Sequence, residues 1–522
     1  MKLLRSTAII GSLTLVSRLL GLVRDVLIAR YLGAGAVSDA FFTAFKLPNV
    51  FRRMFAEGAF NAAFVPLYAK RIEREGEEAA DNFASEVGSM LLVVVLGLVI
   101  AFELTMPWSL NIIGFGLDRT AGADGVVPYD LAVTYALITM PYLLFMSLMA
   151  LLSGIMNTRE KFALPTLALA LLNVFMISAL FFAPRFGLGQ ADIGLALSAA
   201  VTVSGLAQAG LVWWGCKRAG VRLKLRAPKV TPGVKRLVIL GVPGILSAGI
   251  TQINLLVSHS IATTQASAAS WLTYADRLYQ LPLGMIGIAM GIALLPSLSR
   301  SIRAGDEAGA KTSLNRGIEI AAFLTLPAAV ALYVLPEFFI GGIYERGAFT
   351  ASTTEQVAKA LRWFALGLPG FVLLKVLTPA FFARENTRTP MIWAGISAGI
   401  NISLGVALFM TIGFEGLALA TSVAAWVNVA GLFVLLRKNG DLDPDARLLR
   451  HLPRILLASL VMGAALWLVL PYLPDMGETH IVMDFVWLGA VAFAGFVIYA
   501  LAATLLRAYD RADIGRAFSR RS

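Results

Sequence analysis

The chain has 522 residues, of which 58% are hydrophobic and 15% charged, and its formal net charge is +12. Soluble globular proteins are about 45–50% apolar and about 25% charged, so this composition cannot cover the surfaces of soluble domains and indicates a polytopic membrane protein. The sequence has a single cysteine, Cys216, which excludes an intramolecular disulfide. Its three histidines are far apart in the sequence, which argues against a histidine-built metal site.

Fourteen stretches are long and apolar enough to be spanning helices, which need about 20 such residues. In chain order they cover residues 7–29, 34–69, 84–106, 129–156, 162–183, 190–216, 237–261, 268–299, 317–337, 355–382, 391–410, 416–436, 455–471 and 482–506. The second and eighth are too long for one straight crossing and contain Pro48 and Pro282, so we expect each to be broken or kinked. The first resembles a secretory signal, but it has no small-residue cleavage site and contains Arg18, so it predicts a retained helix.

Lysines and arginines alternate between dense and sparse in successive loops, which predicts the orientation of the chain. If the N-terminus is cytoplasmic, 31 of the 44 lie in inside loops and tails and four in outside loops. The sequence therefore predicts a multi-pass protein of the bacterial inner (cytoplasmic) membrane with both termini cytoplasmic. The same loops account for most of the net charge, so the charge does not indicate nucleic acid binding.

The chain repeats itself at an interval of about 228 residues. Each half shares, in the same order, a proline, an Asn-Thr-Arg run, an asparagine and a Gly-Leu-Ala-Leu run: Pro141, Asn157, Asn173 and Gly194 in the first half and Pro369, Asn386, Asn401 and Gly416 in the second. Six crossings return the chain to its starting side, so the repeats are parallel. This is an architecture of secondary transporters, which bind cargo between two lobes and work by alternating access.

The predicted fold is an all-α polytopic membrane protein of 14 transmembrane helices, with two parallel six-helix repeats, two additional C-terminal helices and a central cationic cavity. Residues 1–216 form the N-lobe and residues 217–236 a basic cytoplasmic linker. Residues 237–440 form the C-lobe, and residues 441–522 hold the last two helices and a basic cytoplasmic tail.

Charged side chains inside a membrane are costly and usually face a cavity or a partner. In segments 1, 2 and 8 the cations outnumber the carboxylates: Arg18, Arg24, Lys46, Arg52, Arg53 and Arg277 against Asp25, Asp39, Glu57 and Asp276. Surplus guanidinium groups favour an anionic cargo such as phosphate or pyrophosphate. The alternative for a single residue is snorkelling to an interface or a structural ion pair, which fits Arg52 and Arg53 near a rim and Arg24 beside Asp25.

Enzyme motifs are missing from the sequence. It contains no Walker A motif, no H-E-x-x-H and no nucleophile elbow, and its outside loops offer no recognisable catalytic spacing. These observations favour a transporter without an ATPase of its own over an enzyme.

The run from Lys46 to Pro66, KLPNVFRRMFAEGAFNAAFVP, resembles the signature of the MurJ (MviN) family of lipid II flippases, in the multidrug/oligosaccharidyl-lipid/polysaccharide exporter superfamily. The runs SRLLGLVRD from Ser17, SDAF from Ser38 and YADRL from Tyr274 support the resemblance, which covers essentially the whole chain. The resemblance implies a flippase that moves undecaprenyl-pyrophosphate-linked MurNAc-pentapeptide-GlcNAc from the cytoplasmic to the periplasmic leaflet for peptidoglycan synthesis. It implies membrane lipids and cell-wall synthesis proteins as further partners.

The resemblance also implies roles for particular residues. The matching cations would bind the pyrophosphate and head group, and they are Arg18, Arg24, Arg52 and Arg277. The matching acids would take part in head-group binding or gating, and they are Asp25, Asp39 and Glu57. The charge pattern, rather than the resemblance, adds Arg53 to the cargo-binding set and Asp276 to the charge-pairing set. The last two helices would form a groove for the lipid tail.

The coupling ion stays open. Some relatives have sodium-binding carboxylates in segments 7 and 11, whereas this chain offers the neutral Asn254, Ser397 and Asn401 there. We therefore expect a weakened or absent sodium site and no cofactor, with coupling to membrane potential, protons or sodium.

Two related functions are the alternatives. An O-antigen or polysaccharide-type flippase also carries a prenyl pyrophosphate, and only the segment-2 signature separates the two. A cation-coupled drug exporter would bury acidic residues for its cargo, which the surplus of arginines disfavours.

Overall fold

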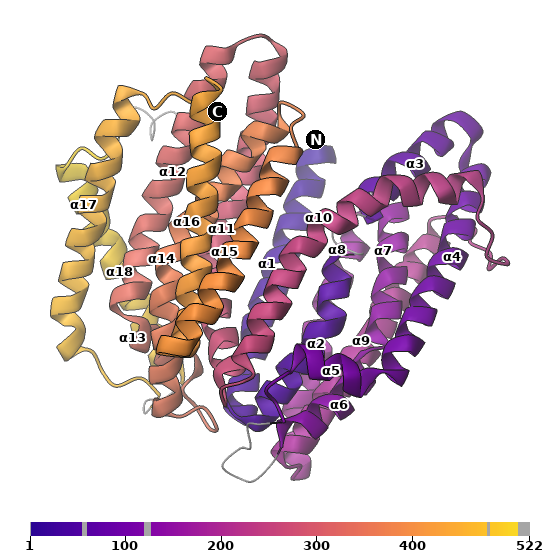
Figure 1. Cartoon of the computed structure of the whole chain (residues 1–522), viewed down its shortest axis with the longest axis horizontal. Helices are drawn as coiled ribbons and strands as arrows, with labels where there is room; N and C mark the ends of the chain where they lie inside the picture. Colours follow the sequence, from indigo (N-terminus) through magenta and orange to yellow (C-terminus); the bar gives the residue numbers. More distant parts are fainter. Residues whose placement is uncertain (1, 55–59, 119–126, 478–480, 510–522) are drawn as a thin grey trace. The chain divides into compact units, whose positions relative to one another are not determined.

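The computed structural model describes residues 2–54, 60–118, 127–477 and 481–509, which form helices and short connections without a strand (Figure 1). The chain divides into two compact units. The first comprises Met1–Ser270 with Gly347–Phe349, and the second comprises Trp271–Arg346 with Thr350–Ser522.

The first unit contains ten α-helices in its described part. They are α1 (Lys2–Leu32), α2 (Ala36–Met54), α3 (Phe60–Glu75), α4 (Glu77–Leu104), α5 (Met106–Ile113), α6 (Pro128–Thr139), α7 (Tyr142–Thr158), α8 (Ala163–Phe182), α9 (Gln190–Arg218) and α10 (Pro232–Ala262). A 3₁₀ turn, η2 (Ala183–Phe186), extends α8. The seventh predicted segment is α10, and it packs within this unit against α2 and α3.

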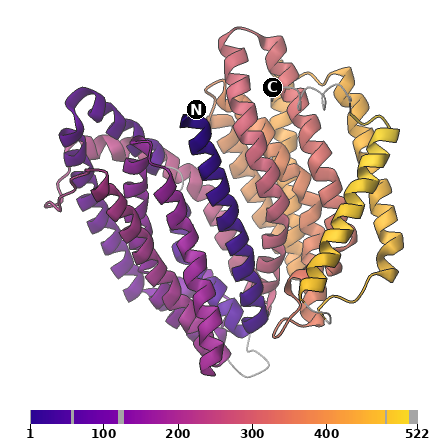
Figure 2. The ribbon, with the colours of Figure 1, turned by 180° about the vertical axis from the view of Figure 1, so that it is seen from behind.

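Most of the remaining helices belong to the second unit. They are α11 (Ala268–Arg303), α12 (Glu307–Val334), α13 (Pro336–Tyr344), α14 (Ala351–Phe382), α15 (Arg388–Ile412), α16 (Phe414–Lys438), α17 (Ala446–Val469), the 3₁₀ turn η3 (Leu470–Tyr472) and α18 (Ile481–Leu505). The two C-terminal helices, α17 and α18, lie side by side at one edge of this unit (Figures 1 and 2).

The helices confirm the polytopic all-α prediction. Ten helical stretches within the described residues are long and apolar enough to cross a membrane, while the count of fourteen crossings stays a prediction. In the second segment α2 continues through Pro48, and residues 55–59, between α2 and α3, lie outside the described residues, so the expected break or kink stays a prediction. The eighth segment was expected to be broken or kinked at Pro282; it is not broken there, because α11 runs through the proline as one helix, and a kink stays a prediction. Neighbouring helices can compensate for the one N–H that a proline removes.

The internal repeat is visible in local geometry. The pairs α4–α5 and α12–α13 each consist of a long helix followed by a short one, and they begin 230 residues apart, at Glu77 and Glu307. An arginine after α7 reaches the first of these glutamates, with Arg159 Nη1 3.1 Å from Glu77 Oε2. An arginine after α14 does the same, with Arg384 Nη2 3.1 Å from Glu307 Oε2. Each repeat therefore has an equivalent arginine–glutamate ion pair, which joins the end of one helix to the beginning of another.

The turns that carry these arginines also repeat. Glu160 and Glu385 follow them with φ of 58° and 60°, in the left-handed region that side chains other than glycine rarely adopt. They are 225 residues apart, so the helix ends are equivalent at this interval rather than at the 229 that separates Asn157 from Asn386. The sequence alignment of the repeat is thus wrong by four residues here, one turn of helix.

The basic linker between α9 and α10 is fastened along α4. Backbone N–H groups of Arg222, Lys224 and Arg226 donate to Asp81 Oδ2, Ser85 Oγ and Ser89 Oγ at 2.8, 3.0 and 3.0 Å. Two residues of extended chain advance about 6.6 Å, and four residues of helix advance about 6 Å. The two spacings match closely enough for three successive hydrogen bonds.

Replacing Asp81 with alanine should loosen this linker. The Asp81 side chain is 7% exposed and also accepts from Arg159 and Tyr68. Because removing one partner leaves a buried charge uncompensated, we expect a loss of about 3–5 kcal/mol in unfolding free energy. Trypsin should then cut the linker faster in detergent-solubilised protein. The exposed neighbour variant Glu78→Ala is the control, and equal cutting in both variants would contradict the attachment.

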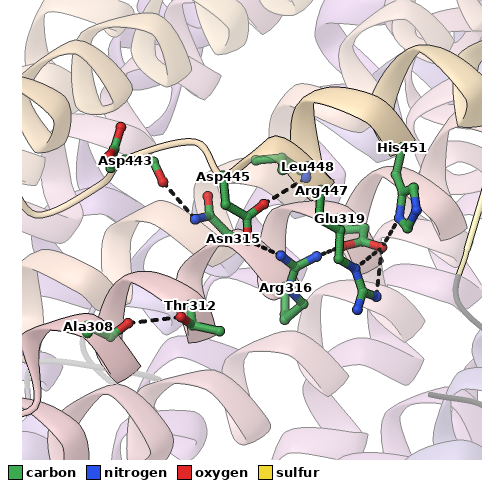
Figure 3. A network of polar contacts seen from close by, with 10 residues as sticks. All are labelled: Ala308, Thr312, Asn315, Arg316, Glu319, Asp443, Asp445, Arg447, Leu448 and His451. Carbon is green, nitrogen blue, oxygen red and sulfur yellow. Dashed lines mark hydrogen bonds and ion pairs between the residues drawn. The ribbon is translucent and has the colours of Figure 1, made fainter. Parts of the chain in front are cut away.

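A polar network joins α17 to α12 in the second unit (Figure 3). Glu319, on α12, accepts from Arg316 and Arg447, and His451 Nδ1 lies 2.6 Å from its Oε1. Arg316 also pairs with Asp445, whose Oδ1 accepts from Leu448 N at 2.7 Å and so caps α17. The network therefore attaches the N-terminal end of α17, the first of the two C-terminal helices, to α12 of the second repeat.

The contribution of Asp445 should depend on pH. Burial alone raises the pKa of its carboxyl, but hydrogen bonds from Leu448 and Arg316, with the charge of Arg447, outweigh burial and hold the pKa below its ordinary value. The stabilisation is therefore complete above the ordinary aspartate pKa of about 4 and is lost as the pH falls through the lower, folded value. We expect Asp445→Asn to lower the melting temperature at neutral pH and to converge with the parent in acid. Asp443→Asn, at an exposed position, should show no such convergence.

Candidate functional site

Arg24, a predicted cargo-binding residue of the first unit, is held by side chains from two helices. It is buried on α1, and its Nε and Nη2 donate to Asp25 Oδ1 at 3.0 and 2.7 Å. Its Nη1 donates to Asn173 Oδ1, on α8, at 2.8 Å, and Asn173 Nδ2 donates to Ser17 O at 3.0 Å. These hydrogen bonds occupy three of the five guanidinium N–H groups, so the side chain is fixed while it retains donors.

The expected structural pairing of Arg24 with Asp25 is therefore present, and it comes with a partner that sequence reasoning missed. Asn173 was noticed as a marker of the repeat, not as a neighbour of Arg24. Its counterpart Asn401 is also buried, where its Oδ1 accepts from Thr421 on the next helix at 3.3 Å. An asparagine in both repeats was the signal that could have found the contact.

Asp39 holds the beginning of α11. It is buried on α2, and its two carboxylate oxygens accept the backbone N–H groups of Ser267 and Ser270 at 2.9 and 2.8 Å, together with the Ser270 hydroxyl. These N–H groups lie at a helix N-terminus, where a negative charge is favourable. Asp39 is thus a capping carboxylate for the helix that carries Asp276 and Arg277.

The other predicted cations of the first unit are half-buried. Arg52 donates from Nε and Nη2 to Asn49 Oδ1 at 3.0 and 2.8 Å, and Arg53 follows it in the last turn of α2. Arg18 lies on α1 and has no hydrogen bond or ion pair with the residues that the structure describes. Glu57 lies outside the described residues.

Asp276 and Arg277 are half-buried on α11, where Asp276 accepts from Gln280. The candidate ion-site residues belong to different units, with Asn254 on α10 in the first and Ser397 and Asn401 on α15 in the second. Ser397 Oγ donates to Ala424 O at 2.8 Å. The sodium site stays a prediction.

A second polar contact in the first unit also escaped sequence reasoning. Thr43 Oγ1 lies 2.9 Å from His259 Nε2, and both side chains are buried, on α2 and α10. The residue next to Thr43 on α2 is also bonded, because Thr139 Oγ1, on α6, donates to Ala44 O. An isolated histidine in an apolar segment was the available signal.

The second unit contains an apolar cavity of about 720 Å³ lined by α12, α14, α16 and α17. Tyr333, Trp426 and Trp467 contribute their rings, and Trp426 Nε1 donates to Leu366 O at 2.8 Å. The cavity involves the first of the two C-terminal helices, while α18 is not among its described lining residues. Its lining suits a hydrocarbon chain rather than a polar ligand.

Apolar helices long enough to span a membrane, ion pairs that recur in the two halves of the chain and a charged side chain buried among helices define a multi-pass membrane transporter. The chain belongs to the lipid II flippase MurJ family, because the family model described as "Lipid II flippase MurJ" matches residues 28–489.

Relatives and solved structures agree with this membership. The chain is 45% identical to "Probable lipid II flippase MurJ" of Rhizobium meliloti (strain 1021) over 473 residues, 91% of this chain and 88% of the relative. It is 34% identical to "Lipid II flippase MurJ" of Burkholderia cenocepacia, covering 89% of each.

The solved structure "Lipid II flippase MurJ, inward closed conformation" matches with a TM-score of 0.78 at 28% identity, over 95% of this chain and 98% of that one. An inward-facing multidrug resistance MATE family transporter matches in fold, with a TM-score of 0.69 at 17% identity, over 83% of this chain and 97% of that one.

Replacing Asn173 with alanine should loosen α1. The change leaves Arg24 Nη1 and Ser17 O without this partner, so we expect a loss of about 1–3 kcal/mol, seen as a lower melting temperature. Ser178→Ala, on the same helix, is the control, because Ser178 bonds only to Val174 O of its own helix in the described contacts. Equal melting of the two variants would contradict a structural role for Asn173.

Proposed function

We propose that this protein is a lipid II flippase that translocates the undecaprenyl-pyrophosphate-linked peptidoglycan precursor across the bacterial inner membrane. The observation that carries the proposal is the family match over residues 28–489. The fixed guanidinium group of Arg24, four residues before that range, supports an anionic cargo. The proposed direction is from the cytoplasmic to the periplasmic leaflet, with both termini cytoplasmic. The distribution of lysines and arginines supports this orientation.

In the proposed mechanism the pyrophosphate binds to arginine side chains. Arg24 supplies a preorganised group, because Asp25 and Asn173 fix its fork and leave two N–H groups for phosphate oxygens. Arg18, Arg52, Arg53 and Arg277 supply further positive charge. Binding of the anion reduces the electrostatic repulsion among the cations that contact it, so the cargo stabilises the conformation that binds it.

Asp39 is proposed to act in gating rather than in cargo binding. Its carboxylate is already engaged with the N-terminus of α11, so it is not available to a ligand in this conformation. Because α11 also carries Arg277, a change at this cap alters the position of a cargo-binding residue. Asp276, beside Arg277 on α11, is proposed to take part in gating through charge pairing.

The isoprenoid tail is proposed to occupy the apolar cavity beside α17. The support is its lining, which offers rings and aliphatic side chains over about 720 Å³. The coupling remains a proposal of membrane potential, protons or sodium, and the neutral Asn254, Ser397 and Asn401 favour a weakened sodium site. Cell-wall synthesis proteins are proposed partners.

The test is externalisation of lipid II in bacteria depleted of their own flippase. We expect the parent to restore externalisation and Arg24→Ala or Arg277→Ala to reduce its rate about tenfold or more, because charge-assisted hydrogen bonds to the cargo are lost. Arg24→Lys should also fail, since an ammonium group lacks the planar fork. Arg300→Ala, at an exposed position on the same helix as Arg277, is the control.

The outcomes separate the function from the site. No restoration by a folded, membrane-inserted parent would contradict the proposed function and favour a flippase for another prenyl pyrophosphate. Restoration by equally expressed Arg24→Ala would keep the function and remove Arg24 from the cargo site.

A further inference from the structure

The described part of the first unit contains a groove between α3 and α10, apart from the residues assigned to the cargo. Its volume is about 480 Å³, and the two helices pack against each other (Figure 1). Four cations line it, Lys70, Arg71 and Arg74 from α3 and Arg236 from α10, against one acid, Glu75. The groove therefore carries a surplus of three positive charges.

The lining changes from basic to apolar along the groove. On α3 the residues Pro66, Lys70 and Arg74 follow one another at intervals of four, so they share one face of the helix. On α10 the apolar Leu240 lies four residues beyond Arg236, on the same face. The lining residues of α3 include both Ala62 and Arg74, and twelve helical residues advance about 18 Å. A ligand of that length therefore meets cations at one end of the groove and hydrocarbon at the other.

One of the cations is held in place by its surroundings. The Arg71 guanidinium lies over the Phe83 ring of α4, 3.8 Å from its centroid, and its Nε is 4.0 Å from Glu75. Gly233 makes room for it, because a Cβ there would lie 2.6 Å from Arg71 Nη2. The absence of a side chain at Gly233 thus keeps a guanidinium group at the groove, where α10 begins.

We propose that this groove binds an anionic glycerophospholipid, with its phosphodiester among the four cations and an acyl chain along the apolar residues. A soluble phosphate would use only the basic end, whereas the lining calls for a molecule with both a charged and a hydrocarbon part. Basic pockets between membrane helices are suited to such head groups. The site uses none of the residues proposed for cargo, so it stands independently of the flippase function.

The basic end lies where the loop charges predict the cytoplasmic surface. Lys70, Arg71 and Arg74 precede α4, and Arg236 follows the linker, both in segments that the sequence assigns to the inside. An anionic lipid of the inner leaflet therefore has its phosphate at the depth of the cations and its chain directed into the bilayer.

The test is native mass spectrometry of the full chain released from vesicles that contain phosphatidylglycerol and phosphatidylcholine. We expect the parent to retain phosphatidylglycerol selectively, and Lys70→Gln/Arg74→Gln to lower the apparent affinity about thirtyfold, from the loss of two cations near the membrane surface. The control is Arg300→Gln/Arg303→Gln, which removes the same charge from exposed positions at the end of α11.

A second arm uses vesicles that contain undecaprenyl pyrophosphate in place of phosphatidylglycerol. Equal retention of phosphatidylglycerol by the two double variants would overturn the site. Loss of undecaprenyl pyrophosphate alone from Lys70→Gln/Arg74→Gln would overturn the phospholipid assignment and make the groove a contact for the cargo. Gly233→Ala, which displaces Arg71 without removing a charge, should weaken phosphatidylglycerol retention while the protein keeps its melting temperature within about 2 °C.

Discussion

A guanidinium group withdrawn from water needs fixed partners, and the bonding of Arg24 shows how the first unit meets this requirement. Asp25 supplies the counter-charge from the same helix, and Asn173 supplies an oxygen from α8 while its own amide reaches Ser17 O. The position of α1 against α8 thus depends on the same atoms that orient the proposed cargo ligand. A side chain held so firmly undergoes little reorganisation when an anion arrives, which favours binding.

One ion pair lies where helices begin and end in each repeat, and a polar network attaches the beginning of the C-terminal helix pair. The pairs Arg159–Glu77 and Arg384–Glu307 occur once in each repeat, and the Glu319 network attaches α17 to α12. Helix ends near the membrane surface can hold charges at lower cost than the helix centres, because water is within reach. The repeats therefore keep their ion pairs at an end and leave few charges in the spans.

The sequence allowed the all-helical fold, the repeat and the family to be predicted, because apolar spans and motif residues are local signals. The uninterrupted path of α11 through Pro282 could not be foreseen, since it depends on the surrounding helices rather than on the proline. The role of Asn173 was only partly accessible, because the repeat singles out this asparagine but does not identify a hydrogen-bond partner 149 positions away. Candidate residues such as Arg24 and Asp39 were chosen for their charge and for the family resemblance. Only the structure shows that Arg24 is fixed by three hydrogen bonds and that Asp39 caps a helix.

The attachment of the basic linker to α4 has a consequence for how its sequence can vary. The acceptors Asp81, Ser85 and Ser89 are side chains of the helix, but the donors in the linker are backbone N–H groups. Any residue except proline provides such a donor. The linker can therefore change its side chains, and accumulate the lysines and arginines that orient a membrane protein, without losing its path along the helix. The attachment of the linker thus depends on its backbone atoms, whereas the orientation of the protein in the membrane depends on its side chains.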